Sequence, residues 1–206
     1  MSIARLGLTA LSLTALVLVS GCALTKKGTP VFVRYFTPEH PPAEGTTSSP
    51  ATGPEVRLGR VTSGSDLGER IVHGDGAYEV GFYDSRRWTE IPEKYVRSAL
   101  ERALFDEGGF RRSVGGNAPT LNVEVLSFME VKNAQTHLAR VALRGMLSTD
   151  HELFAETFAV DQPVDGIRFE DVVAATSHAL DSACQQIAIR VGAALAKPPG
   201  SVRNGW

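Results

Sequence analysis

Three consecutive segments in the second half of the chain constrain its fold more than any other feature. Residues 121–131, 138–147 and 152–160 each carry apolar side chains at alternate positions, and this period of two is typical of half-buried strands. Because the connections between the segments are short, neighbouring strands must run antiparallel. The sequence therefore predicts an antiparallel meander with one buried face and one wetter face.

Two amphipathic helices are predicted, one before the meander and one after it. From Thr89, the expected N-cap, apolar residues recur every three and four positions as far as Leu104, and Gly108 and Gly109 end the pattern. A second apolar stripe runs through residues 169–195. Each helix needs a sheet face against which to bury its stripe. We therefore expect an α+β fold with two helices packed on one face of a mostly antiparallel β-sheet.

Strand-like runs also precede the first helix. The β-branched and aromatic run at 31–36 is followed at 38–54 by a stretch rich in proline, glycine, serine and threonine, a composition typical of an irregular loop. Further strands are expected at 56–61, 69–72 and 77–83. These strands would extend the sheet beyond the meander.

The first 22 residues have the pattern of a targeting segment rather than of a folded element. Arg5 precedes an uncharged apolar stretch, residues 6–19, and the small residues Ser20 and Gly21 then lead to Cys22. A stretch of about 14 apolar residues is too short to cross the hydrocarbon core of a bilayer comfortably. Small residues followed by a cysteine indicate processing rather than a stop-transfer signal.

The four residues 19–22 resemble the bacterial lipobox, in which an aliphatic residue and two small residues precede a cysteine. The resemblance implies that Cys22 is acylated and becomes the first residue of the mature lipoprotein. It also implies that Ala23, where an aspartate would retain the protein at the inner membrane, allows transfer to the outer membrane. The alternatives are an ordinary signal peptide with an incidental cysteine, or a short membrane anchor.

The charge balance bears on the possible partners. The chain has 21 basic and 23 acidic residues, a formal net charge of −2. A domain that binds nucleic acid by counterion release usually needs a clear basic excess, so nucleic acid is not the expected partner. The chain also carries no polybasic segment that would attract anionic lipid. Acyl chains on Cys22 alone would therefore hold it at a membrane.

Motifs that would indicate catalysis are missing from the sequence. It contains no HExxH, GxSxG, P-loop or paired CxxC pattern, and no two of its five histidines have the i, i+4 spacing of a helical metal pair. Once Cys22 is acylated, Cys184 is the remaining cysteine, and its apolar neighbours at helical spacing predict a small buried side chain. We expect no enzymatic activity, no metal and no cofactor.

Four side chains are candidates for contact with a partner protein. Leu126 and Phe128 are apolar residues on the wetter face expected for the first meander strand, while Tyr83 and Trp88 stand near a strand end and before a helix. Apolar and aromatic side chains of this kind can anchor interfaces. The alternative is packing within the core or beneath the loop at 38–54, and the sequence does not decide between the two.

Several short segments, taken in order along the chain, resemble the ABC-type transport auxiliary lipoproteins, the family that includes PqiC. The resemblance extends from about residue 31 to residue 195. The segments are Cys22, residues 33–37, 58–61 and 67–72, Tyr78, Trp88, residues 121–125 with Phe128, and the last helix.

This PqiC-like resemblance implies a periplasmic domain that hangs from the outer membrane and serves an MCE-type lipid transport system. The partners it implies are an MCE-domain protein, an inner-membrane ABC transporter and further copies of the chain in a ring. The alternative is a structural envelope lipoprotein that binds other proteins or peptidoglycan. The expected organisation is a lipoprotein signal peptide at 1–21, a lipidated tether at 22–30, the auxiliary domain at 31–196 and a disordered tail at 197–206.

Replacing the lipobox cysteine tests the predicted processing. The Cys22→Ser variant should remain an uncleaved precursor or become a soluble protein, because serine offers no thiol for acylation. Intact-mass analysis of the mature wild-type protein should show acyl chains on Cys22. A mature protein whose mass includes no acyl chain would contradict the prediction.

Overall fold

The computed structural model describes two stretches of the chain, residues 31–39 and 51–196. The chain divides into two units, residues 1–32 and 33–206, and the fold set out below belongs to the second. The predicted signal peptide, the tether, the C-terminal tail and the central part of the predicted loop, residues 40–50, lie outside the described residues.

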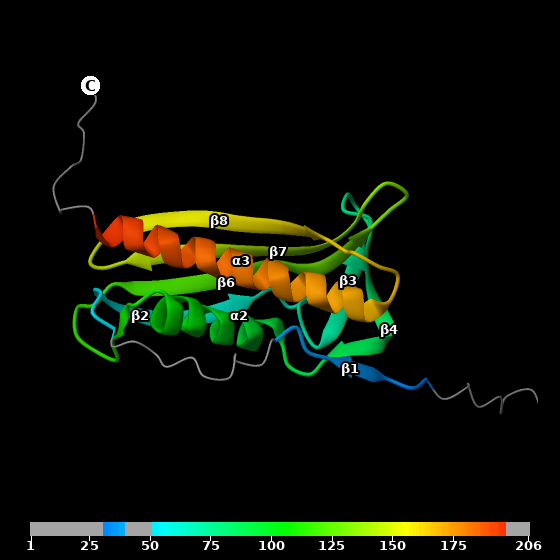
Figure 1. Ribbon diagram of the computed structural model, residues 1–206, viewed down its shortest axis with the longest axis horizontal. Helices are drawn as coiled ribbons and strands as arrows, with labels where there is room; N and C mark the ends of the chain where they lie inside the picture. The colour runs from blue at the N-terminus through cyan, green and yellow to red at the C-terminus, as the bar shows by residue number, and fades with distance from the viewer. Residues whose placement is uncertain (1–30, 40–50, 197–206) are drawn as a thin grey trace, which may run out of the picture. The chain divides into compact units, whose positions relative to one another are not determined.

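The predicted meander forms the largest part of the sheet (Figure 1). β6 (Thr120–Lys132), β7 (His137–Ser148) and β8 (Glu152–Pro163) pair antiparallel in sequence order. Alternate side chains of β7, among them Val141 and Leu143, are fully buried. The alternation in the sequence therefore identified both the strands and the buried face of β7.

The other edge of β6 carries strands that come earlier in the chain. Their bounds are β1 (Arg34–Phe36), β2 (Glu55–Ser63), β3 (Arg70–Gly74), β4 (Val80–Trp88) and β5 (Arg111–Arg112). β2 runs parallel to the first half of β6, and β3 runs parallel to its second half. β4 lies antiparallel to β3, and β1 and β5 add parallel strands at the margins. The result is a mixed, mostly antiparallel sheet of eight strands.

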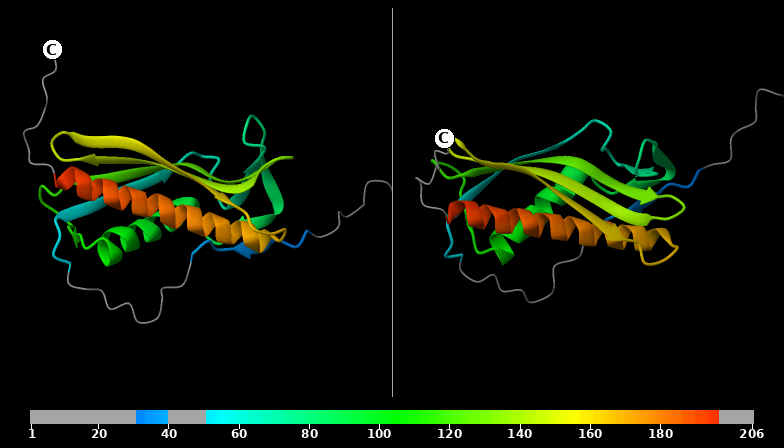
Figure 2. Two further views of the ribbon diagram at one scale, coloured as in Figure 1. Left: turned by 45° about the horizontal axis from the view of Figure 1, so that its top comes forward. Right: turned by 90° about the horizontal axis from the view of Figure 1, so that it is seen from above.

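The helices cover one face of this sheet (Figures 1 and 2). They are α2 (Pro92–Glu101), its π-helical continuation η2 (Arg102–Glu107) and the long α3 (Phe169–Leu195). α3 packs on β7 and β8, while α2 packs on β2 and against α3. The predicted α+β fold, with helices on one face of a mostly antiparallel sheet, is confirmed, and the core lies between the two layers.

Several predicted boundaries differ from the structure, among them the strand expected at 77–83, which is β4 at Val80–Trp88. The first strand was predicted at 31–36 and begins at Arg34. Of this run, only residues 34–36 have hydrogen-bonding partners on β4. The first helix begins at Pro92, a position where the missing N–H of proline costs no hydrogen bond. Thr89 does not cap it, since the Thr89 hydroxyl lies 2.7 Å from the Tyr95 hydroxyl and Ile91 is the N-cap.

A β-bulge in the middle of β6 changes which side chains face the helices. The pairing with β7 shifts register between Val125 and Ser127. An extra residue in one strand moves the following side chains to the opposite face. As a result Phe128, rather than Met129, continues the buried row of Leu121 and Val125.

Leucines on the buried side of each helix should carry much of the stability. Leu100 of α2 and Leu180 of α3 are 0% and 2% exposed. Truncation of a buried leucine to alanine typically costs about 2–5 kcal/mol, so Leu100→Ala and Leu180→Ala should lower the melting temperature sharply. Ser98→Ala and Gln186→Ala, on the exposed sides of the same helices, are the matched controls. Equal effects in all four variants would contradict this helix packing.

Candidate functional site

Two of the three predicted interface aromatics, Phe128 and Trp88, lie in the core. Phe128 is 0% exposed and Trp88 is 2% exposed. The Phe128 ring centroid lies 5.5 Å from that of Trp88 and 6.4 Å from that of Tyr95 on α2. Of the two alternatives that the sequence left open for Phe128, a docking patch or packing, its burial supports packing, because the bulge in β6 turns its side chain toward the helices. Trp88 is likewise enclosed and does not reach the surface.

The other two predicted interface residues occupy different environments. Leu126 lies at the bulge and is 47% exposed. Tyr83 is half-buried, and its ring packs 5.2 Å from Phe169 and 4.7 Å from His73. The Arg86 guanidinium lies 4.4 Å above the Tyr83 ring. The structure therefore does not bring the four predicted residues together into one patch, and Leu126 is the most exposed of them.

A polar network that the sequence did not predict joins three strands. The Tyr83 hydroxyl on β4 donates to the Glu130 carboxylate on β6, and Nε2 of His137 on β7 lies 2.8 Å from the same carboxylate. Burial, followed by the neighbouring Glu130, raises the pKa of Tyr83 to about 12. Glu130 is only 3% exposed, so both of its partners satisfy a carboxylate that has lost contact with bulk water.

The network borders a cavity of about 190 Å³ that also reaches His73 and Lys132. Within the residues that the structure describes, no group of three or more histidine, cysteine or acidic side chains could hold a metal ion. The groups of the network are 47 and 7 residues apart in the sequence, and no spacing rule links them. The strand itself gave no signal, because β6 also contains Glu124, a second glutamate that is only partly buried.

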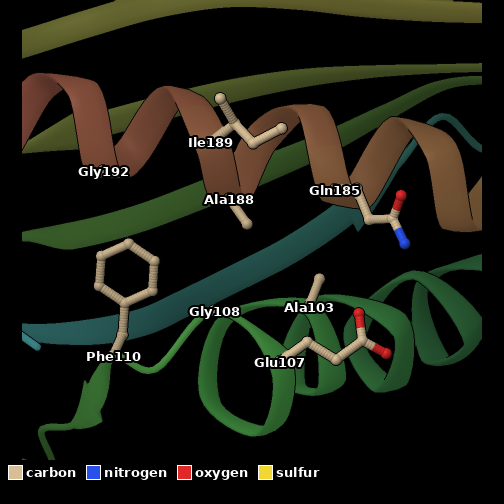
Figure 3. Close-up of a pocket in the computed structure, with 8 residues that line it drawn as sticks. All are labelled: Ala103, Glu107, Gly108, Phe110, Gln185, Ala188, Ile189 and Gly192. Carbon is tan, nitrogen blue, oxygen red and sulfur yellow. The ribbon is translucent and has the colours of Figure 1, made fainter. Parts of the chain in front are cut away.

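An apolar pocket lies between η2 and the C-terminal half of α3 (Figure 3). It has a volume of about 370 Å³. Phe110, Ala103 and Ala188 point into it, and Ile189 stands at its rim with 73% of its surface exposed. The complete lining is Ala103, Glu107, Gly108, Phe110, Gln185, Ala188, Ile189 and Gly192.

The local chain conformation shapes this pocket. The π-helical turn η2 ends at Gly108, where an added Cβ would lie 2.6 Å from the Ala103 carbonyl oxygen. A glycine is therefore required where the chain leaves η2 and brings Phe110 under α3. A π-helical turn is an uncommon departure from the α-helix that is found often at functional sites.

The charge next to the pocket is partly compensated. Glu107 lies 3.6 Å from Nε of Arg102, and Arg102 also pairs with Asp181 on α3, so that two carboxylates share one guanidinium. The pocket thus combines an apolar floor with a weakly acidic rim, and the floor suits an apolar side chain or a short hydrocarbon segment. The sequence did contain a signal for this pocket. Ile189 lies outside the apolar stripe of its helix, and a large apolar side chain at such a position is exposed to solvent.

Cys184 agrees with its predicted role. It is fully buried in α3, and burial raises the pKa of its thiol, with Asp181 adding to the effect. A thiol held in the neutral form is a poor nucleophile. Cys184 is therefore a small core residue.

Comparison with known proteins now identifies the family. The model of the ABC-type transport auxiliary lipoprotein component matches residues 36–188. Because this match covers most of the chain and nearly all of the described fold, the chain belongs to the family of ABC-type transport auxiliary lipoproteins. No curated protein sequence matches the chain.

Solved structures share the fold at low sequence identity. Protein XCC0632 from Xanthomonas campestris, of the family DUF330, is 17% identical, with a TM-score of 0.64 over 79% of this chain and 96% of that one. The hypothetical protein CT253 from Chlamydia trachomatis is 8% identical, with a TM-score of 0.50 over 69% of this chain and 97% of that one. At such identities the likeness concerns the fold alone.

The bulge and the aromatic cluster yield a direct test. Truncation of a buried phenylalanine typically costs about 3–5 kcal/mol, and a buried unpaired carboxylate adds to the loss. Phe128→Asp should therefore unfold the domain, as followed by circular dichroism. Leu126→Asp, two residues away on an exposed position, should leave the melting temperature nearly unchanged. A folded Phe128→Asp variant would show that Phe128 is not a core residue.

Proposed function

We propose that the protein is an outer-membrane-anchored periplasmic lipoprotein and a non-catalytic auxiliary component of an MCE-type ABC lipid transport system. Membership of the auxiliary lipoprotein family, over residues 36–188, is the observation that carries the proposal. The activity then resides in contact surfaces, in keeping with a pocket lined mainly by apolar side chains.

The proposed anchor is the acylated Cys22. Within residues 31–39 and 51–196, no helix has the length and apolar character that a bilayer span requires. Each buried methylene contributes about 0.8 kcal/mol, and two or more acyl chains hold a protein stably on a bilayer. Ala23, in place of an aspartate, supports transfer to the outer membrane.

The proposed docking surface for the MCE-domain protein is the pocket between η2 and α3. β1, which the chain reaches first after the tether, lies at one end of the domain, and the C-terminal part of α3 lies at the other (Figure 1). At about 1.5 Å per residue, the 27 residues of α3 span about 40 Å. A partner bound next to Ile189 would therefore meet the lipoprotein on the side away from its tether.

Assembly into a ring is also part of the proposal. Among the strands of residues 31–39 and 51–196, β8 pairs only with β7, so its outer edge presents backbone N–H and C=O groups that another strand could use. The Val164 N–H donates to the His137 carbonyl oxygen of β7 at 3.1 Å. Because backbone groups alternate in direction along a strand, the nitrogen of Pro163, one residue earlier, is on the side of β8 that points away from β7. A proline whose missing N–H faces outward is typical of an edge strand.

An acidic substitution at the pocket rim tests the docking surface. Ile189→Asp should abolish co-purification with the MCE partner, because a well-packed interface anchor is worth about 2 kcal/mol or more, roughly thirtyfold in affinity. Val114→Asp, at a position 95% exposed in the loop after β5, is the matched control. Unchanged co-purification by Ile189→Asp would place docking elsewhere. Capture of peptidoglycan instead of the MCE partner by the wild-type protein would favour a structural envelope lipoprotein.

A further inference from the structure

Exposed apolar side chains gather at one end of the folded unit. Of the nine exposed large hydrophobic residues within the described part of residues 33–196, five lie in or beside β1, the β3–β4 turn and the β8–α3 loop. Figures 1 and 2 place these three segments at the same end, which we call the β1 end. The five are Val33, Tyr35, Tyr78, Val80 and Ile167, exposed by 41%, 62%, 99%, 58% and 99%.

Contacts between the segments hold this end together. Arg34 of β1 pairs with Glu170 at the start of α3 at 2.7 Å, and the rings of Phe36 and Phe169 are 4.8 Å apart. On the other side, the Asn133 side chain donates to the Asp75 carbonyl oxygen at 3.0 Å, which ties the β6–β7 turn to the β3–β4 turn. The exposed apolar side chains therefore stand on segments that are joined to the rest of the fold.

Several charged groups around these segments pair with one another, and the others include two basic residues, Arg86 and Arg87 on β4, and two acidic ones, Glu79 and Asp165, in the adjacent turn and loop. Glu170 is held by Arg34, and Asp171 pairs with Arg168 at 3.3 Å. The Asp75 carboxylate accepts three backbone N–H groups within its own turn. The β1 end consequently offers no excess of basic charge for anionic lipid, and what it presents is tyrosine and aliphatic surface. Tyrosine is enriched at the membrane–water interface, where its ring is buried and its hydroxyl stays wet.

The path of the chain places a membrane next to this end. Thirteen residues separate Cys22 from Tyr35, and a chain extends by at most about 3.5 Å per residue, or roughly 45 Å in all. We infer that the β1 end rests on the bilayer that holds the acyl chains, with Tyr35, Tyr78 and Ile167 in its headgroup layer. This inference rests on the proposed acylation of Cys22. Monomeric proteins rarely gather exposed apolar residues without a partner, and the lipid surface is the partner that the tether brings within reach.

A probe at single positions tests the contact. Because Cys22 is acylated and Cys184 is buried, an introduced cysteine is the reactive thiol of the mature protein. Ile167→Cys and Tyr78→Cys are labelled with an environment-sensitive fluorophore. The control is Val114→Cys, in the loop after β5, because β5 pairs with the start of β2 whereas the β3–β4 turn adjoins the far half of β6. The labelled lipoproteins are then reconstituted into phosphatidylcholine–phosphatidylethanolamine vesicles that contain a spin-labelled lipid.

Quenching by the spin label should be severalfold stronger at positions 167 and 78 than at position 114. It should persist at high salt, because the contact is apolar. Equal quenching at the three positions in an acylated protein would contradict the proposed contact between the β1 end and the bilayer. The proposal that Cys22 is the lipid anchor would be unaffected by that result. Unquenched probes at 167 and 78, together with disulfide cross-linking of the unlabelled cysteine variants to a second copy, would overturn the bilayer contact in favour of a protein contact. A chain without acyl groups, seen by intact mass, would overturn the anchor and the orientation together.

Discussion

The packing of Phe128 between Trp88 and Tyr95 is the contact on which the rest of the domain depends. Phe128 belongs to β6, Trp88 ends β4 and Tyr95 lies in α2, so this one cluster joins the meander, the early strands and the first helix. Its rings meet at centroid distances of 5.5 to 6.4 Å, within the range of favourable aromatic pairs. The cluster requires the bulge in β6, because an unbroken alternation would have placed Phe128 in solvent.

The same strand also carries the principal buried charge. Two residues after Phe128, Glu130 is enclosed and is satisfied by Tyr83 and His137 from the neighbouring strands. Such a network stabilises one arrangement of β4, β6 and β7 only while every member has its partner. The apolar cluster and the polar network together hold β3 and β4 in one position relative to the meander. They therefore also determine where the β3–β4 turn lies.

The fold gives the domain two ends joined by α3, and each is assigned a contact in the proposals above. The β1 end receives the chain from the proposed lipid anchor and carries the exposed tyrosines and Ile167, whereas the other end carries the pocket next to Ile189. Because α3 is a single helix of 27 residues packed along β7 and β8, it keeps the two ends apart at a set distance. An auxiliary lipoprotein that links a membrane to a transport partner needs this separation, and the docking and membrane contacts proposed above use one end each.

The sequence by itself determined those features that arise from neighbouring residues. Alternation defined β6, β7 and β8, helical spacing defined α2 and α3 to within a few residues, and the order of short segments led to the correct family. Only the tertiary structure decided the parallel pairing of β2 and β3 with β6, the bulge at Leu126, and the meeting of η2 with α3 around Phe110. Periodicity reports which face of an element is apolar, but not which distant element covers it. A bulge of one residue in a strand reverses that face for the residues that follow, and this is why Phe128, which was expected on the wetter face of its strand, belongs to the core.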